Sequence, residues 1–248
     1  MSEAAGTLIV VGVGSDTGPA VCRRFAREGY AVAMVSRRPE RLAPLAKELG
    51  RARAYGADAT DGAALAAAFD AAERDLGPIT VAIANTAHGL LLSSIADMES
   101  GALETMWRTL TLGAFHTARE AAKRMGPRGA GSIMFTGGRQ SRRGDPGFGA
   151  FAIAQFGIRA LAETLSRELA PNGIHVAHLI VEGTIAKDYA RTARPEQFAQ
   201  GAMVDPESLA EIYWQTHAQP RTCWTFEVDV RPWTEPLFAQ WQRPKQPS

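Results

Sequence analysis

The sequence predicts an α/β fold: a doubly wound parallel sheet with helices on both faces, formed by a single domain over residues 1–248. Short apolar runs rich in Val, Ile and Ala alternate with longer segments of helical period, as in buried parallel strands joined by crossover helices. A chain of 248 residues with 46% hydrophobic content can bury one such core. No internal repeat, low-complexity tract or linker divides the sequence, so we expect one domain.

The expected strands and helices follow one another in order along the chain. The first apolar run predicts a strand at Thr7–Val13, and the helical period behind it predicts a helix over Thr17–Glu28. Further strands are predicted at Ala31–Ser36, Ala52–Ala57, Ile79–Ala84, Ser132–Thr136, Ile174–Val181 and Thr222–Val230. Further helices are predicted at Pro39–Leu49, Asp61–Asp75, Glu99–Met125, Phe151–Leu169 and Pro206–His217.

Two segments near the end of the chain are less regular. Residues 183–205 show little periodicity, and long loops of this kind often close over a site, so we expect a substrate lid there. Asp205 fits the N-cap of the helix that follows, with Pro206 at its first position. Residues 222–248 are expected to form the last strand and a tail rich in Pro and Trp.

Composition excludes several classes of function. The net charge of +1, from 27 basic and 26 acidic side chains, gives no reason to expect a nucleic-acid partner. Cys22 and Cys223 form no CxxC pair and the five His residues show no metal-ligand spacing, so no metal is expected. Without a leader or an apolar run of roughly 20 residues, we expect a cytoplasmic protein that does not enter a membrane.

A glycine-rich turn follows the first strand and opens the first helix. Glycines at such a turn let the backbone approach a pyrophosphate, whose charge suits a helix N-terminus. Asp16 is unusual here, because a carboxylate about 4 Å from a phosphate charge repels it by roughly 1 kcal/mol even in water. We therefore expect Asp16 to cap the helix, or else to weaken cofactor binding. The expected cofactor-binding residues of this turn are Gly12, Gly14, Ser15, Asp16, Thr17 and Gly18.

A second motif lies after the long helix. The stretch from Gly131 to Gly138, a loop to Gly149, and Phe151-Ala-Ile-Ala-Gln155 resemble the catalytic segment of short-chain dehydrogenases/reductases. The glycine turn resembles a divergent form of that family's Thr-Gly-x-x-x-Gly-x-Gly, and the resemblance covers about residues 7–185. It implies a Rossmann-like fold and an oxidoreductase that acts with NAD(P).

The resemblance also indicates how a cofactor would be held. Family members that prefer NAD usually carry an acidic residue after the second strand, where this chain has Arg37 and Arg38. Guanidinium groups match phosphate geometry, so NADP(H) is expected, with NAD as the alternative. A pair of solvated arginines is the competing interpretation. Asp58 and Ala59 stand where the family contacts the adenine, and Asn85 matches its Asn-Asn-Ala-Gly motif.

The catalytic residues that the resemblance implies are absent. Leu110 stands at the expected Asn, Gly138 at the Ser, Phe151 at the Tyr and Gln155 at the Lys. Phe151 cannot transfer a proton, and losing a positioned acid or base typically costs about 100- to 10,000-fold in rate. The nearby hydroxyls of Thr136 and Ser141 have no Tyr or Lys partner in the next helix. Gln155 retains the ability to bond the nicotinamide ribose.

Other groups are weaker candidates for catalysis. His88 follows the fourth strand on the correct edge of the sheet, although a lone loop His is more often only solvated. The loop Arg139–Arg143 either binds an anion or is ordinary surface. In or beside the lid lie Glu182, Lys187, Asp188 and Tyr189. Tyr189 is the only Tyr expected near the site, but a mobile loop is a poor place for a precisely held acid. The other histidines near the predicted sheet, His116, His175 and His178, are expected to be structural.

Three functions remain open at this point. The first is an NADP(H)-dependent oxidoreductase with a non-standard or impaired site, the second a non-redox enzyme that reuses the pocket. The third is a nucleotide-binding or partner-stabilising protein without turnover. The resemblance further implies a homodimer or homotetramer formed through the helices Glu99–Met125 and Phe151–Leu169. The tail aromatics expected to support subunit burial are Trp224, Phe226, Trp233 and Trp241.

Overall fold

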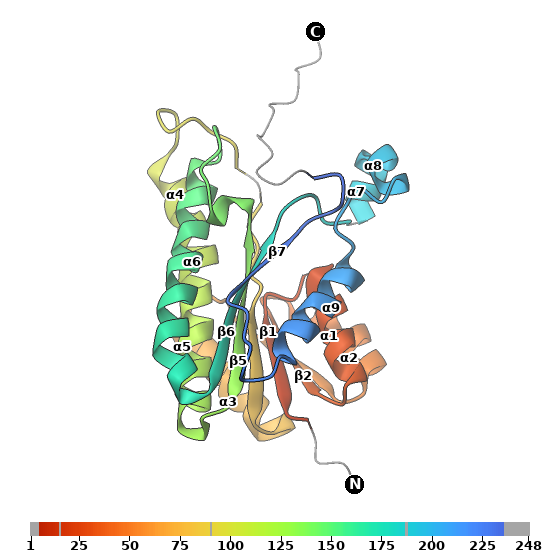
Figure 1. Ribbon diagram of the computed structural model, residues 1–248, viewed down its shortest axis with the longest axis vertical. Helices are drawn as coiled ribbons and strands as arrows, with labels where there is room; N and C mark the ends of the chain where they lie inside the picture. The colour runs from red at the N-terminus through yellow and green to blue at the C-terminus, as the bar shows by residue number, and fades with distance from the viewer. Residues whose placement is uncertain (1–4, 15, 90, 187, 236–248) are drawn as a thin grey trace.

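A computed structural model describes residues 5–14, 16–89, 91–186 and 188–235, without the side chains of residues 188, 189 and 191. Its sheet has seven strands in the order β3-β2-β1-β4-β5-β6-β7, and every neighbouring pair is parallel. This confirms the doubly wound sheet (Figure 1). The strands are β1 (Thr7–Val11), β2 (Ala31–Ser36), β3 (Ala52–Gly56), β4 (Ile79–Ala84), β5 (Gly131–Gly138), β6 (Ile174–Val181) and β7 (Glu227–Val230).

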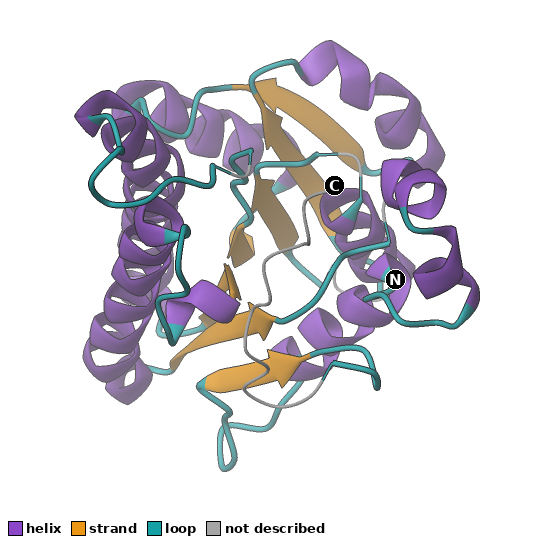
Figure 2. Ribbon diagram, turned by 90° about the horizontal axis from the view of Figure 1, so that it is seen from above, coloured by secondary structure: helices purple, strands orange, loops and turns teal. Residues whose placement is uncertain are grey.

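Helices cover both faces of the sheet. One face packs against α1 (Thr17–Arg27), α2 (Ala43–Leu49) and α9 (Pro206–His217). The other packs against α3 (Gly62–Leu76), α4 (Ser100–Trp107), α5 (Gly113–Met125) and α6 (Gly149–Leu169). Figure 2, seen from above, shows the sheet between these two layers of helices. No helix in the described ranges has the length and apolar character needed to cross a membrane.

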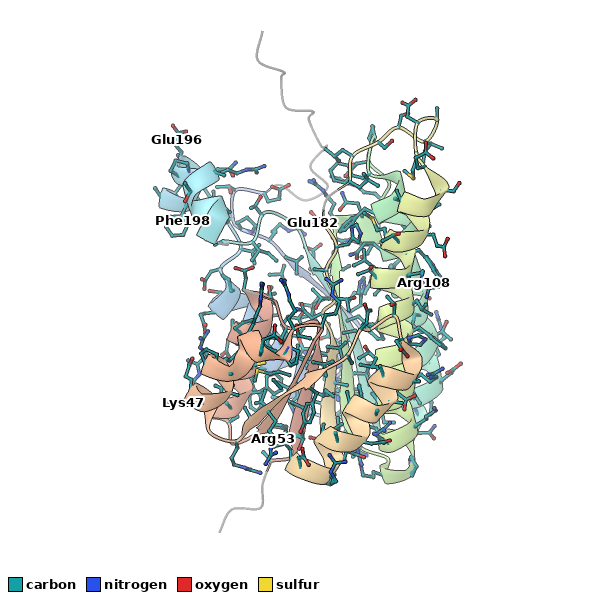
Figure 3. The ribbon with its side chains drawn as sticks, turned by 180° about the vertical axis from the view of Figure 1, so that it is seen from behind. Lys47, Arg53, Arg108, Glu182, Glu196 and Phe198 are labelled. Carbon is teal, nitrogen blue, oxygen red and sulfur yellow. The ribbon has the colours of Figure 1, made fainter. Side chains whose placement is uncertain are left out.

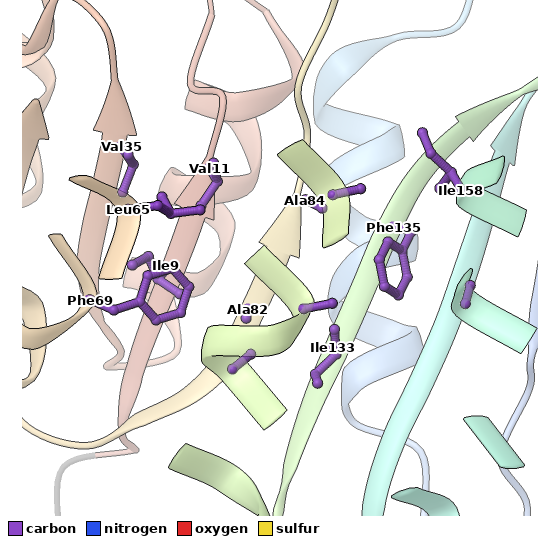
Figure 4. Close-up of a cluster of buried hydrophobic side chains, with 14 of the residues drawn as sticks. Ile9, Val11, Val35, Leu65, Phe69, Ala82, Ala84, Ile133, Phe135 and Ile158 are labelled. Carbon is purple, nitrogen blue, oxygen red and sulfur yellow. The ribbon is translucent and has the colours of Figure 1, made fainter. Parts of the chain in front are cut away.

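The core follows from strands that are buried on both faces. In β1, Ile9 and Val11 join the cluster under α3 and α5, whereas Leu8 and Val10 join the cluster under α1 and α9. Full burial of one such side chain stabilises the fold by roughly 1.5–3 kcal/mol. Figure 4 shows the first cluster, in which Phe69 of α3 lies against Ile9. The carboxyl ends of the strands are therefore presented by a rigid layer.

Several element ends differ from the expected ones by one to three residues, and three elements differ in kind or by more. The helix predicted over Glu99–Met125 is divided by a π-helical turn at Arg108–Leu112, which separates α4 from α5. A 3₁₀ turn at Pro39–Leu42 precedes α2. The strand predicted at Thr222–Val230 begins only at Glu227, because Gln219 holds the preceding segment in a turn. The Gln219 side chain accepts a bond from Thr225 N at 2.7 Å and donates to Thr225 Oγ1 at 2.9 Å.

The segment expected to be a lid is more ordered than its sequence indicated. Residues 183–205 contain two short helices, α7 (Asp188–Ala193) and α8 (Pro195–Ala199). A parallel bridge between Ile185 and Val204 joins the two ends of the segment. Both helices lie to one side of the strand ends in Figure 1. The segment thus leaves the sheet as two short helices, and its two ends are held together by this bridge.

Candidate active site

A cavity of about 1040 Å³ lies where the crevice was expected, at the carboxyl ends of the strands. Its lining comes from the glycine turn after β1, the ends of β4, β5 and β6, the start of α6 and the segment that carries α7 and α8. In Figure 3, Glu182 at the end of β6 lies between α8, which carries Glu196 and Phe198, and the helix layer with Arg108. The cavity therefore combines the expected cofactor and catalytic positions in one space.

Steric crowding explains the first and last glycines of the turn. Gly12 has φ +93°, and a Cβ there would lie 2.6 Å from the carbonyl oxygen of Asn85. A Cβ on Gly18 would lie 3.0 Å from Val13 Cα. A Cβ on Gly14 would meet no atom within 4 Å, so this side of its backbone is accessible to a ligand. This arrangement fits a backbone that approaches a phosphate group closely.

Contrary to the prediction, the Asp16 side chain does not cap α1. It occupies the N-cap position with φ −126° and ψ −86°, but its side chain makes no capping hydrogen bond. A capping side chain needs the extended backbone that Asp61 has at the start of α3, where it accepts bonds from Ala63 N and Ala64 N. Asp16 instead lines the cavity beside Thr17 and Gly18. The other residue predicted in this turn, Ser15, lies outside the described residues.

Asn85 links the glycine turn to the centre of the sheet. Its Nδ2 donates to Gly12 O at 2.9 Å, and its Oδ1 accepts from Thr136 Oγ1 at 2.9 Å. Thr136 Oγ1 also contacts Tyr213 Oη of α9 at 2.5 Å. Because Thr136 donates to Asn85, the Tyr213 hydroxyl is the donor in that contact. Burial raises the pKa of Tyr213, so its hydroxyl stays protonated. This hydroxyl is the last donor in the series of hydrogen bonds that runs through Thr136 and Asn85 to Gly12.

The region expected to select the cofactor holds cations. Arg37 and Arg38 are exposed after β2, and no ion pair within 4.0 Å between described residues includes either of them. Asp58 accepts bonds from Thr60 N and Thr60 Oγ1, both at 2.8 Å. The Thr60 N–H is the main group that holds the pKa of Asp58 below its usual value, with a smaller contribution from the Arg37 charge. The next residue is Ala59, whose carbonyl oxygen lies 3.0 Å from His116 Nδ1.

All four positions of the implied catalytic set line the cavity, and none carries an ionisable side chain. Leu110 is 1% exposed in the π-helical turn, a form of helix found often at functional sites. Gly138 ends β5, and Phe151 lies in the first turn of α6. Gln155, one turn further on, is 5% exposed. The backbone thus brings together the four positions that the resemblance implied.

Gln155 takes part in a neutral hydrogen-bond network. Its Oε1 accepts from Ser141 Oγ at 2.9 Å and from Gly138 N at 3.1 Å. Both bonds fix the orientation of the amide, because only the NH₂ group is left to point elsewhere. Gln155 can therefore offer a cofactor ribose a donor but not an acceptor. Sequence reasoning named Ser141 only as an isolated hydroxyl and missed this pairing.

His88 is exposed at the edge of the same cavity. Its Nδ1 lies 2.8 Å from the carbonyl oxygen of Gly89. A carbonyl only accepts, so Nδ1 carries the proton, and Nε2 of the neutral ring is an acceptor. The side chain of Tyr189 and the whole of Lys187 lie outside the described residues.

The arginines of the loop after β5 are paired with carboxylates. Arg139 pairs with Asp145 at 3.5 Å and with Glu235 at 3.2 Å, and Arg143 pairs with Asp145 at 3.3 Å. Arg142 contacts Asp229 of β7 and, at 3.1 Å, the buried Glu182. Arg231 contacts the same two carboxylates. These charges neutralise one another and hold the loop against β6 and β7.

His175 and His178 are buried in the sheet, as expected of structural residues. His175 Nε2 lies 2.9 Å from Thr225 O, and the ring stacks on Trp224 with centroids 4.9 Å apart. His178 Nδ1 lies 3.2 Å from Glu227 Oε1. Burial lowers the pKa of both rings, so both are neutral near pH 7. Across the ranges that the structure describes, no group of three or more His, Cys, Asp or Glu side chains could hold a metal.

Comparison with known proteins shows the relationship. A model of the family described as short chain dehydrogenase matches residues 6–198. An inactive 2-(S)-hydroxypropyl-CoM dehydrogenase of Xanthobacter autotrophicus is 30% identical over 77% of this chain and 88% of its own length. The crystal structure of a short-chain dehydrogenase from Rhodopseudomonas palustris is 34% identical, with a TM-score of 0.79 over 92% of this chain and 99% of its own.

A more distant structure shares the fold. The alcohol dehydrogenase of Thermococcus sibiricus, solved with 5-hydroxy-NADP, is 20% identical and has a TM-score of 0.82 over 94% of this chain and 99% of its own. At this identity, the likeness shows that the two chains share the fold. The chain belongs to the short-chain dehydrogenase family, which includes oxidoreductases that act with NAD(P).

Proposed function

We propose that this protein binds NADP(H) in the cavity and has an impaired version of the family's oxidoreductase site. One observation carries the proposal: the described residues of the glycine turn and the four positions implied by the resemblance line one cavity, and those positions hold Leu110, Gly138, Phe151 and Gln155. The first half of the cavity has the steric features of a nucleotide site. At these four positions of the second half, no side chain can act as the acid that gives a proton to a substrate oxygen.

The preference for NADP(H) over NAD rests on charge. Arg37 and Arg38 stand exposed after β2 without a carboxylate partner in the described ranges, and guanidinium groups bind a 2′-phosphate well. An Arg37→Glu variant should bind NADPH at least about 10-fold more weakly, since a charge-assisted hydrogen bond is worth about 1.5–3 kcal/mol. Its affinity for NADH should change little. Equal NADPH affinity in both proteins would remove this assignment.

Hydride transfer to a carbonyl generates an alkoxide that needs a proton. In the cavity, the position of the phenol holds Phe151 and the position of the ammonium holds the Gln155 amide, whose oxygen is engaged. His88 is the proposed alternative proton-transfer group: with Nδ1 engaged at Gly89 O, it would give the alkoxide a proton from Nε2 of the doubly protonated ring and return to the neutral form. We expect carbonyl reduction at least about 100-fold slower than with a positioned acid.

A nucleotide-binding protein without turnover is the second candidate. Gln155 and Ser141 are buried, and their network with the Gly138 N–H is uncharged, which suits a structural role. Fluorescence titration with NADPH, followed by NADPH consumption over a panel of carbonyl and enoyl compounds, separates the candidates. Binding with slow consumption supports the first, and binding without consumption supports the second. Absence of NADPH binding would exclude both.

We also propose a homodimer or homotetramer. The outer faces of α4, α5 and α6 expose Trp107, Phe115, Ile153 and Phe156, each with 40–48% of its surface accessible. Large apolar side chains gathered on one helical layer are typical of a protein interface. Sedimentation velocity should therefore show a species of at least twice the 26.6 kDa chain mass, and a monomer at micromolar concentration would exclude this proposal.

A further inference from the structure

Arg194 is a cation in the cavity lining that has no carboxylate partner among the described residues. Its Nη1 donates to Thr184 Oγ1 at 3.2 Å and to Gln197 Oε1 at 3.4 Å, and both of these acceptors are uncharged. No ion pair within 4.0 Å in the described ranges includes it. The other arginine of the lining, Arg139, is neutralised by two carboxylates. Arg194 therefore carries a charge that no described carboxylate compensates.

The backbone holds Arg194 at the mouth of the cavity. Its N–H donates to Ala190 O at 2.9 Å, and its carbonyl accepts from Phe198 N at 3.1 Å, so it joins α7 to α8. The base of the segment is closed by the bond from Val204 N to Thr184 O at 2.9 Å. Arg194 Nε and Nη2 bond to no described residue. These two donors form the planar fork that binds an oxyanion with two hydrogen bonds.

The ligand expected in the cavity supplies such an oxyanion. The glycine turn and the first turn of α1 line the same cavity, and the carboxylate of Asp16 adds negative charge to that lining. An anion placed there needs a cation nearby, because like charges at a few ångströms repel. Thr184, Gln197 and Gln200 add hydrogen-bonding groups around the free guanidinium.

We propose that Arg194 binds an oxyanion of the ligand in this cavity and gives the site its preference for anionic ligands. The inference rests on the proposed function, in that the cavity is taken as the nucleotide and substrate site. The oxyanion has two sources, the pyrophosphate of the cofactor or a carboxylate of the substrate. Both present oxygens to the same guanidinium fork.

The test compares Arg194→Gln, Arg194→Lys and wild type, with Arg167→Gln as the control. Arg167 is 72% exposed on α6, pairs with Glu163 and lies outside the cavity lining, so its removal changes net charge alone. If the cofactor supplies the anion, Arg194→Gln should raise the Kd for NADPH by about 10-fold or more, and Arg194→Lys by less. If a substrate supplies it, NADPH affinity should stay unchanged. Succinate binding to the NADPH-loaded protein should then weaken by a similar factor.

One outcome would contradict the role of Arg194, and another would contradict the proposed function. NADPH and succinate affinities of Arg194→Gln that both remain within about 2-fold of those of Arg167→Gln would overturn the role of Arg194. Wild-type protein that binds no NADPH would overturn the proposed function instead. In that case, calorimetric titration of the unloaded proteins with inorganic pyrophosphate and succinate still decides the role of Arg194. A ratio of about 10 between variant and control supports that role, and equal affinities overturn it.

Discussion

The hydrogen bonds that Thr136 makes under the glycine turn can be tested by removing its hydroxyl. Thr136→Val keeps the shape of the side chain but removes the group that donates to Asn85 Oδ1 and accepts from Tyr213 Oη. Tyr213 is fully buried, so its hydroxyl would lose its acceptor where water cannot replace it. Leaving a buried donor unsatisfied costs about 1–3 kcal/mol. Asn85 is only partly buried, and water can satisfy part of its requirement.

The two sites should be coupled. Tyr213→Phe removes a donor while Thr136 still bonds to Asn85, so it should cost only about 0.5–1.5 kcal/mol. In the Tyr213→Phe background no buried hydroxyl is orphaned, and Thr136→Val should then cost roughly 1 kcal/mol less than it does alone. Urea denaturation of the four proteins measures this cycle. Thr164→Val, on the exposed face of α6, is the matched control and should stay within about 0.5 kcal/mol of wild type.

A coupling free energy near zero would show that the Tyr213 hydroxyl does not depend on Thr136. The NADPH affinity of Thr136→Val adds a second reading, because Asn85 Nδ2 holds the Gly12 carbonyl at 2.9 Å. We expect NADPH binding to weaken by a few fold as Asn85 gains freedom. Unchanged stability and unchanged affinity together would overturn the role given to these hydrogen bonds.

Further predictions follow from individual residues. Gly12→Ala should destabilise the fold by about 1–3 kcal/mol and weaken NADPH binding, because φ +93° is strained for Ala and its Cβ would lie 2.6 Å from Asn85 O. Urea denaturation midpoints and fluorescence titration with NADPH measure the two effects. Burial lowers the pKa of His217 to about 4, from 6.5, so the neutral ring stabilises the fold above pH 6.5 and that stability is lost as the pH falls toward 4. Denaturation at pH 7 and pH 4.5 should show a loss on the order of 2 kcal/mol that His217→Gln reduces, and an equal loss in both proteins would exclude His217 as the cause. Phe156→Glu together with Trp107→Glu should shift sedimentation toward the monomer, because each places a charge on an exposed apolar face; an unchanged profile would place the interface elsewhere.

Local patterns predicted the sheet well because β1, β2, β4 and β6 are largely apolar runs and β5 has an apolar centre; of β1 to β6, only the short edge strand β3 carries a charged side chain, Arg53. The same local reasoning identified Gly12 and Gly18, whose conformation and packing the structure explains. It failed at β7, where the Gln219 side chain converts the start of an apparent strand into a turn. It also missed α7 and α8, which have six and five residues and are too short to show helical periodicity.

The sequence predicted which residues lie around the cavity, but not the hydrogen bonds that they make there. Leu110, Gly138, Phe151 and Gln155 lie around one cavity as the resemblance implied. The pairing of Gln155 with Ser141 could not be predicted, because it depends on how the loop after β5 returns toward α6. Residues that meet across the fold carry no mark in the local sequence.

The arginines illustrate the same limit. Arg139, Arg142 and Arg143 form a basic cluster in the sequence, yet each is paired with a carboxylate in the structure. Arg194 attracted no attention in the sequence, yet its guanidinium lines the cavity without such a partner in the described ranges. The availability of a charge is set by its neighbours in three dimensions.

Restoring the family's catalytic set tests most directly whether this cavity is a nucleotide site without its acid and base. Gly138→Ser is sterically permitted, since a Cβ there would lie 3.6 Å from Val181 O, an ordinary contact. Combined with Phe151→Tyr and Gln155→Lys, it should raise NADPH-dependent reduction of a carbonyl panel by about 100-fold or more at unchanged NADPH affinity. Fast reduction by the unaltered protein, with no gain in the triple variant, would show that a different group already supplies the proton.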